Sequence, residues 1–139
     1  MVAAEPQAIW NVLADFGAIS AWARNVDHSC LLSPETQDVG VGTTRRIQVD
    51  RNTLVERITA FDRERTLAYD VEGFPGWLRV NNRWTFAPSA GATVVTLVSS
   101  VTVTGPLGRI AEGAIARASA KTLDELLDGL AKRVEVRSV

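Results

Sequence analysis

The sequence predicts an α+β fold, in which a curved antiparallel β-sheet of six to seven strands wraps around a long C-terminal helix and follows two short N-terminal helices. Two observations carry this prediction. Six consecutive stretches between residues 26 and 104 show the period-two alternation of half-buried strands, and residues 106–133 show a helical period. Because only short turns separate the stretches, neighbouring strands should pair antiparallel. We expect residues 1–139 to form a single domain.

The N-terminal helices are predicted at residues 6–14 and 18–23. Pro6 suits a first helical turn, where its missing N–H has no partner to lose, and apolar residues then recur at helical spacing. Gly17 separates the two helices. After them the period changes to two, and strands are predicted at residues 26–32, 43–49, 53–61, 66–71, 78–87 and 93–104.

The long C-terminal helix has two unlike halves. Small residues line its first half, around Ala111 to Ala118, and leucines line its second half, around Leu123 to Leu130. If the sheet curls around this helix, leucines can fill the space between helix and sheet, whereas alanines cannot. We therefore predict a small-molecule cavity beside the first half, with Ala114 and Ala118 in its wall.

Composition excludes several functional classes. The chain is 46% hydrophobic and 22% charged, and its net charge of −1 gives no electrostatic footprint for nucleic acid or an anionic membrane. One cysteine cannot form an internal disulfide, the N-terminus lacks the pattern of a signal peptide, and no apolar run is long enough to span a bilayer. We expect a cytoplasmic protein without a cofactor. The positively charged residues are nearly all arginines, with few lysines, and this suggests a GC-rich, bacterial genome.

The chain has one histidine and one cysteine, His28 and Cys30, two positions apart. Residues i and i+2 of a strand share a face, so the imidazole could activate the thiol as a nucleophile. A small cysteine in a strand is more often inert packing. These two ligands cannot complete a zinc site without carboxylates from other strands, and we expect no metal. For His28 two alternatives remain, a polar pocket residue and a histidine at the rim of the sheet.

Four motifs in order give the chain a resemblance to a known superfamily. They are P-x-x-I-W-x-V-L-A-D-F at Pro6–Phe16, V-G-x-x-R at Val41–Arg45, V-E-R-I-x-x-F-D at Val55–Asp62 and L-x-Y-x-V at Leu67–Val71. Together they resemble the START-related SRPBCC superfamily, also called polyketide cyclase/dehydrase, which includes birch-pollen-allergen-type proteins and plant abscisic-acid receptors. The resemblance covers nearly the whole chain, although Met1–Ala3 could be only the end of the family's first strand.

The resemblance implies a helix-grip fold, which hosts binders, carriers and enzymes alike. In abscisic-acid-receptor-like members an ionisable pocket residue precedes S-C, and that position is His28 here; the glutamate of the fourth strand, here Glu56, also faces the pocket. Of the two turns at the family's mouth-loop positions, residues 73–77 are the better gate, with Phe74 and Trp77 beside hinge glycines. Strand parity adds further wall candidates: Cys30, Arg45, Tyr69, Val80, Asn82 and Trp84.

Arg45 and Glu56 have two interpretations. On adjacent strands that face inward they would form a buried ion pair, because unpaired charges inside a protein are costly. Alternatively, Arg45 or His28 would anchor a carboxylate or carbonyl of a ligand, with Glu56 as its partner or as a general base.

Three functions therefore stay open. The first is the binding or transport of a small hydrophobic molecule, such as a lipid, a polyketide-like compound, an aromatic or an isoprenoid, in a cavity between sheet and helix. The second is a cyclase or dehydratase of the polyketide type that uses Glu56 and His28 as acid and base in the same cavity. The third is a module that binds a macromolecular partner, which the near-neutral charge does not favour. The protein could be a monomer or, if an exposed edge strand pairs two subunits, a homodimer.

Overall fold

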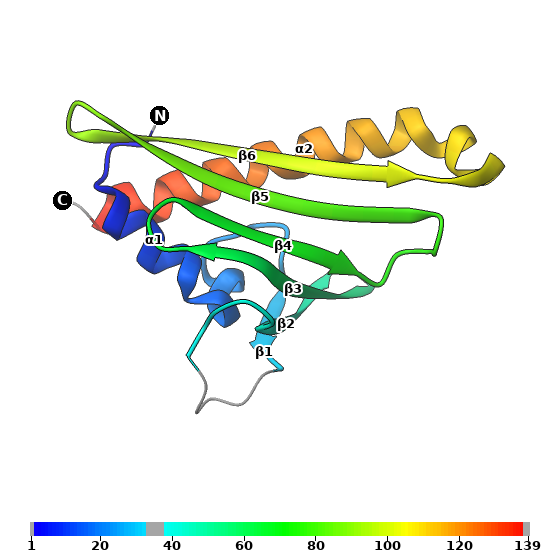
Figure 1. The fold of residues 1–139 in the computed structure, drawn as a ribbon, viewed down its shortest axis with the longest axis horizontal. Helices are drawn as coiled ribbons and strands as arrows, with labels where there is room; N and C mark the ends of the chain where they lie inside the picture. Colours follow the sequence, from blue (N-terminus) through cyan, green and yellow to red (C-terminus); the bar gives the residue numbers. More distant parts are fainter. Residues whose placement is uncertain (1, 33–37, 138–139) are drawn as a thin grey trace.

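The structure, a computed structural model, describes residues 2–32 and 38–137; in the last helix it describes the side chains of residues 105–106, 113, 116–118 and 120–135. Among the described residues, a nine-residue helix and a short 3₁₀ helix come first, and six strands and one long helix follow (Figure 1). The elements are α1 (Pro6–Ala14), η1 (Phe16–Ala21), β1 (His28–Leu31), β2 (Thr44–Val49), β3 (Asn52–Asp62), β4 (Thr66–Glu72), β5 (Leu78–Ser89), β6 (Ala92–Val103) and α2 (Gly105–Arg137).

The strands form one antiparallel sheet in the order β1-β2-β3-β4-β5-β6, so every strand pairs with its neighbour in sequence. Beyond β6 the sheet continues as a bridge between Val2 and Thr93, whose amides donate to each other's carbonyls at 2.7 and 2.9 Å. The register of β3 against β4 shifts between Ile58 and Ala60. Such a bulge bends a strand and increases its twist, which helps the sheet to curve around the helix.

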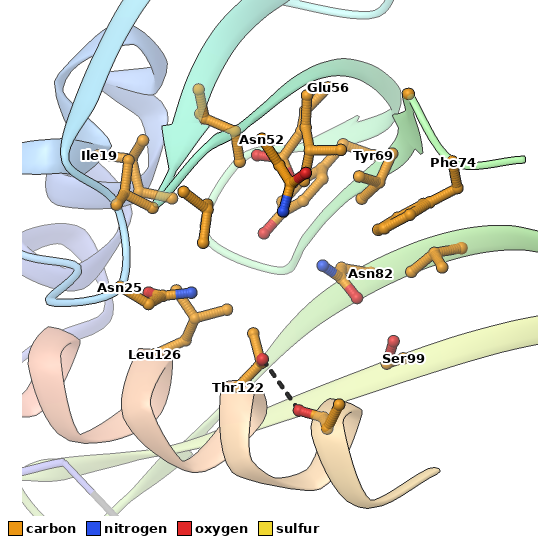
Figure 2. Close-up of a pocket in the computed structure, with 18 of the residues that line it drawn as sticks. Ile19, Asn25, Asn52, Glu56, Tyr69, Phe74, Asn82, Ser99, Thr122 and Leu126 are labelled. Carbon is orange, nitrogen blue, oxygen red and sulfur yellow. Dashed lines mark hydrogen bonds between the residues drawn. The ribbon is translucent and has the colours of Figure 1, made fainter. Parts of the chain in front are cut away.

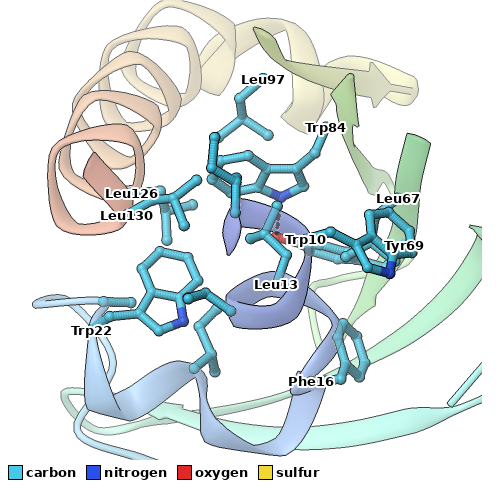
Figure 3. Close-up of a cluster of buried hydrophobic side chains, with 14 of the residues drawn as sticks. Trp10, Leu13, Phe16, Trp22, Leu67, Tyr69, Trp84, Leu97, Leu126 and Leu130 are labelled. Carbon is cyan, nitrogen blue, oxygen red and sulfur yellow. Dashed lines mark hydrogen bonds between the residues drawn. The ribbon is translucent and has the colours of Figure 1, made fainter. Parts of the chain in front are cut away.

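The helix α2 runs along the length of the sheet, and α1 lies beside its C-terminal end (Figure 1). At that end the space between helix and sheet is filled by large side chains (Figure 3). Leu130 and Trp84 are fully buried there, and the rings of Trp22 and Trp84 meet edge to face with their centroids 6.2 Å apart. Burial of such large apolar surfaces is the main source of stability in a domain of this size.

The predicted fold class is correct, and the predicted elements differ from the structure mainly at their ends. The second helix is a 3₁₀ segment that begins two residues earlier than predicted, at Phe16, with a kink at Ala18. The first strand is shorter than predicted, because the Val26 amide still donates to the Ala23 carbonyl in a turn. The last helix extends at both ends, from Gly105 to Arg137.

Candidate functional site

A cavity of about 470 Å³ lies between the sheet and the middle of α2 (Figure 2). Its walls come from η1 and the loop after it, from β2 to β6, and from one face of α2. Most of the surface of the wall is apolar, as in ligand sites of proteins generally. The aliphatic lining residues are Ile19, Val26, Ile47, Val49, Leu54, Val71, Leu78, Val80, Leu123 and Leu126.

One end of the cavity is lined by exposed residues, among them Asn52 and Thr53 at the start of β3 and Phe74 in the turn after β4. This end is the mouth. Gly73 brings the two turns together: its φ is +115°, and a β-carbon there would lie 3.0 Å from the Thr53 carbonyl oxygen. A residue with a side chain would be both strained and too close, so glycine is required where the mouth narrows. Phe74, 38% exposed, stands at this opening.

Among the described residues that line the cavity, the only charged one is Glu56, and it forms an ion pair with Arg45 of the neighbouring strand. Glu56 Oε1 accepts from Arg45 Nε at 2.8 Å and lies 2.7 Å from Nη2. Arg45 Nη1 donates to the Phe16 carbonyl at 2.9 Å, and the guanidinium stacks 3.7 Å from the centroid of the Phe16 ring. Both side chains are buried, with Arg45 3% and Glu56 4% exposed. The pair therefore satisfies its own charges inside the protein, as buried charges must.

Tyr69 lies next to this ion pair, and it belongs both to the cavity wall and to the buried core. Its hydroxyl accepts from Trp84 Nε1 at 3.3 Å, and its ring meets Phe16 edge to face. Burial, together with the negative charge of Glu56, raises the pKa of the Tyr69 hydroxyl above its usual value. A phenol of ordinary pKa is already neutral at physiological pH, and the upward shift strengthens this, so Tyr69 carries a proton that it can donate.

Neutral polar groups complete the lining. The amide of Asn82 lies opposite Tyr69 across the β4–β5 pair, and Ser99 lies opposite Asn82 on β6. At the other side of the cavity stands Asn25, whose Oδ1 is buried without a hydrogen-bond partner among the described residues (Figure 2). An unpaired buried acceptor costs free energy unless a ligand or water satisfies it. Thr122 of α2 lines the cavity but donates its hydroxyl to the Ala118 carbonyl at 3.0 Å.

Several of the site residues predicted from the sequence do line the cavity. They are Glu56, Tyr69, Phe74, Val80, Asn82 and Ala118. Two others are buried but lie behind the wall. Arg45 is held by its ion pair, and Trp84 belongs to the core, where it contacts Trp22. Trp77 is half-buried and is not part of the lining, although it belongs to the turn that was predicted as a gate. The side chain of Ala114 lies outside the described part of the chain.

The face predicted for the first strand is wrong. β1 exposes His28 and Cys30 and turns Ser29 and Leu31 inward. The physical reason is the packing of η1: Ser29 Oγ donates to the Gly17 carbonyl at 2.8 Å, and Leu31 covers the space where a β-carbon of Gly17 would lie. Because strand side chains alternate, this contact sends the other two residues to the outer face. His28 and Cys30 therefore do not line the cavity, and the structure does not bring His28 and Glu56 together.

Several lining residues were not predicted from the sequence. Ser99 could have been found by extending strand parity from Asn82 to the next strand, because the two are paired in the sheet. Asn25 lies in an irregular loop, and Asn52 begins a strand at a turn. Neither position shows a periodic pattern from which the direction of a side chain follows.

Among the residues that the structure describes, no group of three or more His, Cys, Asp or Glu side chains could hold a metal ion, and no helix is long and apolar enough to cross a membrane.

Comparison with solved structures places this arrangement in a known fold. Over 99% of this chain and 91% of the other, it is similar to the Zhui aromatase/cyclase from a Streptomyces species, with a TM-score of 0.78 and 18% identity. A Thermus thermophilus crystal structure has a TM-score of 0.75 and 20% identity over 99% of this chain and 94% of the other. A START superfamily protein from Mycobacterium smegmatis has a TM-score of 0.70 and 18% identity, over 96% and 92%.

A comparison with curated protein sequences finds no match. The model of one protein family, described as "Polyketide cyclase / dehydrase and lipid transport", matches residues 1–135. With the fold, this match establishes the resemblance that the sequence motifs indicated, and it supports a ligand-binding or cyclase role. The chain belongs to the polyketide cyclase / dehydrase and lipid transport family.

Proposed function

We propose that this protein binds a small, largely apolar molecule in the cavity between its sheet and α2. The observation that carries the proposal is the cavity itself, which has about 470 Å³ of space and a mostly aliphatic wall beside a packed core. Ligand cavities in proteins span roughly 300–1,000 Å³ and combine apolar walls with a few polar groups. The polar groups here, Glu56, Tyr69, Asn82 and Asn25, would orient the ligand rather than supply most of its binding energy.

The position of the mouth supports the same proposal. An apolar ligand leaves water on entering and gains roughly 25 cal/mol for each Å² of apolar surface that it buries. Phe74 stands at the opening, where it can contact a ligand that fills the cavity. A lipid, a polyketide-like compound, an aromatic or an isoprenoid of suitable size would fit this description.

A second candidate function is that of a cyclase or dehydratase, and one observation favours it. Glu56 and Tyr69 line the same cavity, so a carboxylate and a neutral phenol would both face a bound substrate. These are groups that can take and give a proton next to a carbonyl. Binding remains the leading proposal, because Glu56 Oε1 is already held by Arg45 and the predicted partner His28 lies on the outer face.

The test of binding uses a pair of substitutions on α2. Ala118 and Ala120 are both exposed residues of α2, but of the two only Ala118 lines the cavity. Ala118→Trp should obstruct the cavity and weaken the binding of a neutral fluorescent probe such as naphthol by about tenfold or more, while Ala120→Trp should leave it unchanged. Native mass spectrometry of the freshly purified protein would show whether a ligand co-purifies. Equal binding by both variants would place the probe elsewhere and contradict the proposal.

Turnover separates the two candidate functions. Wild type and Tyr69→Phe should be incubated with a linear poly-β-ketone, and products should be followed by liquid chromatography with mass detection. A cyclase would release a cyclised or dehydrated product, and the loss of the phenol proton would slow its formation. A binding protein would retain the substrate unchanged in both forms.

A further inference from the structure

The charges beside the cavity are arranged asymmetrically. Glu56 contributes to the wall, whereas its cationic partner Arg45 does not. All three guanidinium nitrogens of Arg45 are engaged, two with Glu56 and one with the Phe16 carbonyl. No lysine, arginine or histidine is among the described residues that line the cavity. A ligand beside this part of the wall therefore meets a carboxylate and no cation that could compensate a negative charge.

The remaining polar groups of the lining are neutral. The phenol of Tyr69 is protonated at neutral pH, and burial and the neighbouring carboxylate raise its pKa further. Asn82 and Asn25 carry amides, which both donate and accept, and Ser99 carries a hydroxyl. One acceptor among them, Asn25 Oδ1, has no partner within the described part of the chain. The described wall thus offers several acceptors, one of them formally negative, and no positive charge.

These observations set a condition on the ligand. The inference drawn from them rests on the proposed function. We infer that the cavity selects neutral ligands that carry hydrogen-bond donors, and rejects carboxylates of the same size and shape. A buried carboxylate would lose its hydration and meet Glu56, whose partner Arg45 lies behind the wall, and it would find no free cation among the described lining residues. A hydroxyl or amide N–H can instead donate to the Glu56 carboxylate, and hydrogen bonds to an ionised acceptor are stronger than neutral ones.

A pair of isosteric ligands tests this inference. Naphthamide and naphthoate have the same shape, but naphthamide is neutral and has N–H donors, whereas naphthoate is an anion. Isothermal titration calorimetry at neutral pH should give naphthamide an affinity at least about tenfold higher in the wild-type protein. Equal affinities, or tighter binding of naphthoate, would overturn the inference and leave the proposed function standing. Binding of neither compound would count against the proposed function itself, and the inference would fall with it.

Removal of the carboxylate should change the preference. In Glu56→Gln the guanidinium of Arg45 loses its counter-charge beside the cavity, so the preference for naphthamide over naphthoate should shrink by about fivefold or more, or reverse. The matched control is Glu72→Gln, which removes the same charge from an exposed position outside the lining. An unchanged ratio in a folded Glu56→Gln protein would overturn the inference.

Adding a cation gives a second variant that leaves the Arg45–Glu56 pair intact. Ser99 lines the cavity from β6, and Ser100 is the next residue, exposed on the opposite face. Ser99→Lys should raise the affinity for naphthoate by about fivefold or more, because the ammonium supplies the missing counter-charge, whereas Ser100→Lys should not. A Ser99→Lys protein that binds naphthoate no better than wild type would contradict the role assigned to charge.

Discussion

The two ends of the space between sheet and helix differ in what fills them. Beside the C-terminal half of α2, Leu130 and Val134 are buried in the same cluster as Trp22 and Trp84, and large side chains fill the space (Figure 3). Beside the middle of the same helix the sheet continues, and a cavity lined by Ala118 and Thr122 remains between helix and sheet.

Within the described part of α2, the packed region coincides with large buried side chains, and the cavity begins where smaller ones join the wall. Ala118 and Thr122 are small residues on the cavity wall. Leu126 marks the boundary, since it is buried in the core and also lines the cavity. Protein interiors are otherwise closely packed, so an unfilled space of about 470 Å³ sets this region apart from the core.

A leucine-to-alanine substitution should lower the free energy of unfolding more in the packed core than on the cavity wall, and this is the largest effect that we predict. Leu130→Ala should lower the free energy of unfolding by about 2–5 kcal/mol, because it opens a hole among fully buried side chains. Leu123 is half-buried on the cavity wall. Leu123→Ala should cost less than about 2 kcal/mol, because a space already exists there. Urea unfolding measures both, and equal costs would mean that the cavity is closed in solution.

Adding a single methyl group should change stability in opposite directions at two glycines of α2, Gly129 in the packed core and Gly113 on the exposed surface. A β-carbon on Gly129 would lie 2.5 Å from the Trp22 carbonyl oxygen, so Gly129→Ala should destabilise the protein by about 1–3 kcal/mol through overpacking. At Gly113 the nearest atom would be the end of the Arg117 side chain, 4.0 Å away. Gly113→Ala should therefore stabilise the helix by about 0.5–1 kcal/mol. Thermal and urea unfolding of the two variants compare them directly; the same sign in both would break the contrast.

The smallest predicted effect concerns Tyr69, which stands between the two regions and is the only tyrosine of the chain. The pKa of its phenol is raised in the folded state. The contribution of this phenol to the free energy of unfolding is therefore fully present below the ordinary pKa of about 10, and it is lost as pH rises through the pKa of the folded state. Between these two pKa values, the stability of wild type should fall faster with pH than that of Tyr69→Phe, by up to about 1 kcal/mol per pH unit, because the unfolded state releases the phenol proton first.

The comparison of slopes is necessary because Tyr69→Phe also removes the acceptor of Trp84 Nε1 at every pH. Ultraviolet difference spectroscopy gives an independent measurement, since tyrosinate can arise only from this residue. Tyrosinate should form only as the protein unfolds. Tyrosinate formation near the ordinary pKa with the fold intact would show that Tyr69 is accessible to water and would contradict the buried position.

By itself, the sequence determined the order and type of nearly every element. Periodicity reports which residues of one element share a face, and turns such as 73–77 are marked by glycine and proline. Strand parity also placed Tyr69 and Asn82 on inward positions of their strands, and the resemblance to the family placed Glu56 there. The match of residues 1–135 to the family confirms the resemblance that the motifs indicated.

Tertiary structure decided what periodicity leaves open. Parity gives two faces to a short strand such as β1 but does not say which one is buried; the packing of η1 against Ser29 chose the face that exposes His28. Parity likewise put Arg45 on an inward face, but only the contacts of its guanidinium show that it is held by Glu56 and Phe16 and lies behind the cavity wall. Contacts between elements distant in sequence fixed both outcomes, because a local pattern carries no information about which other element will cover a given face.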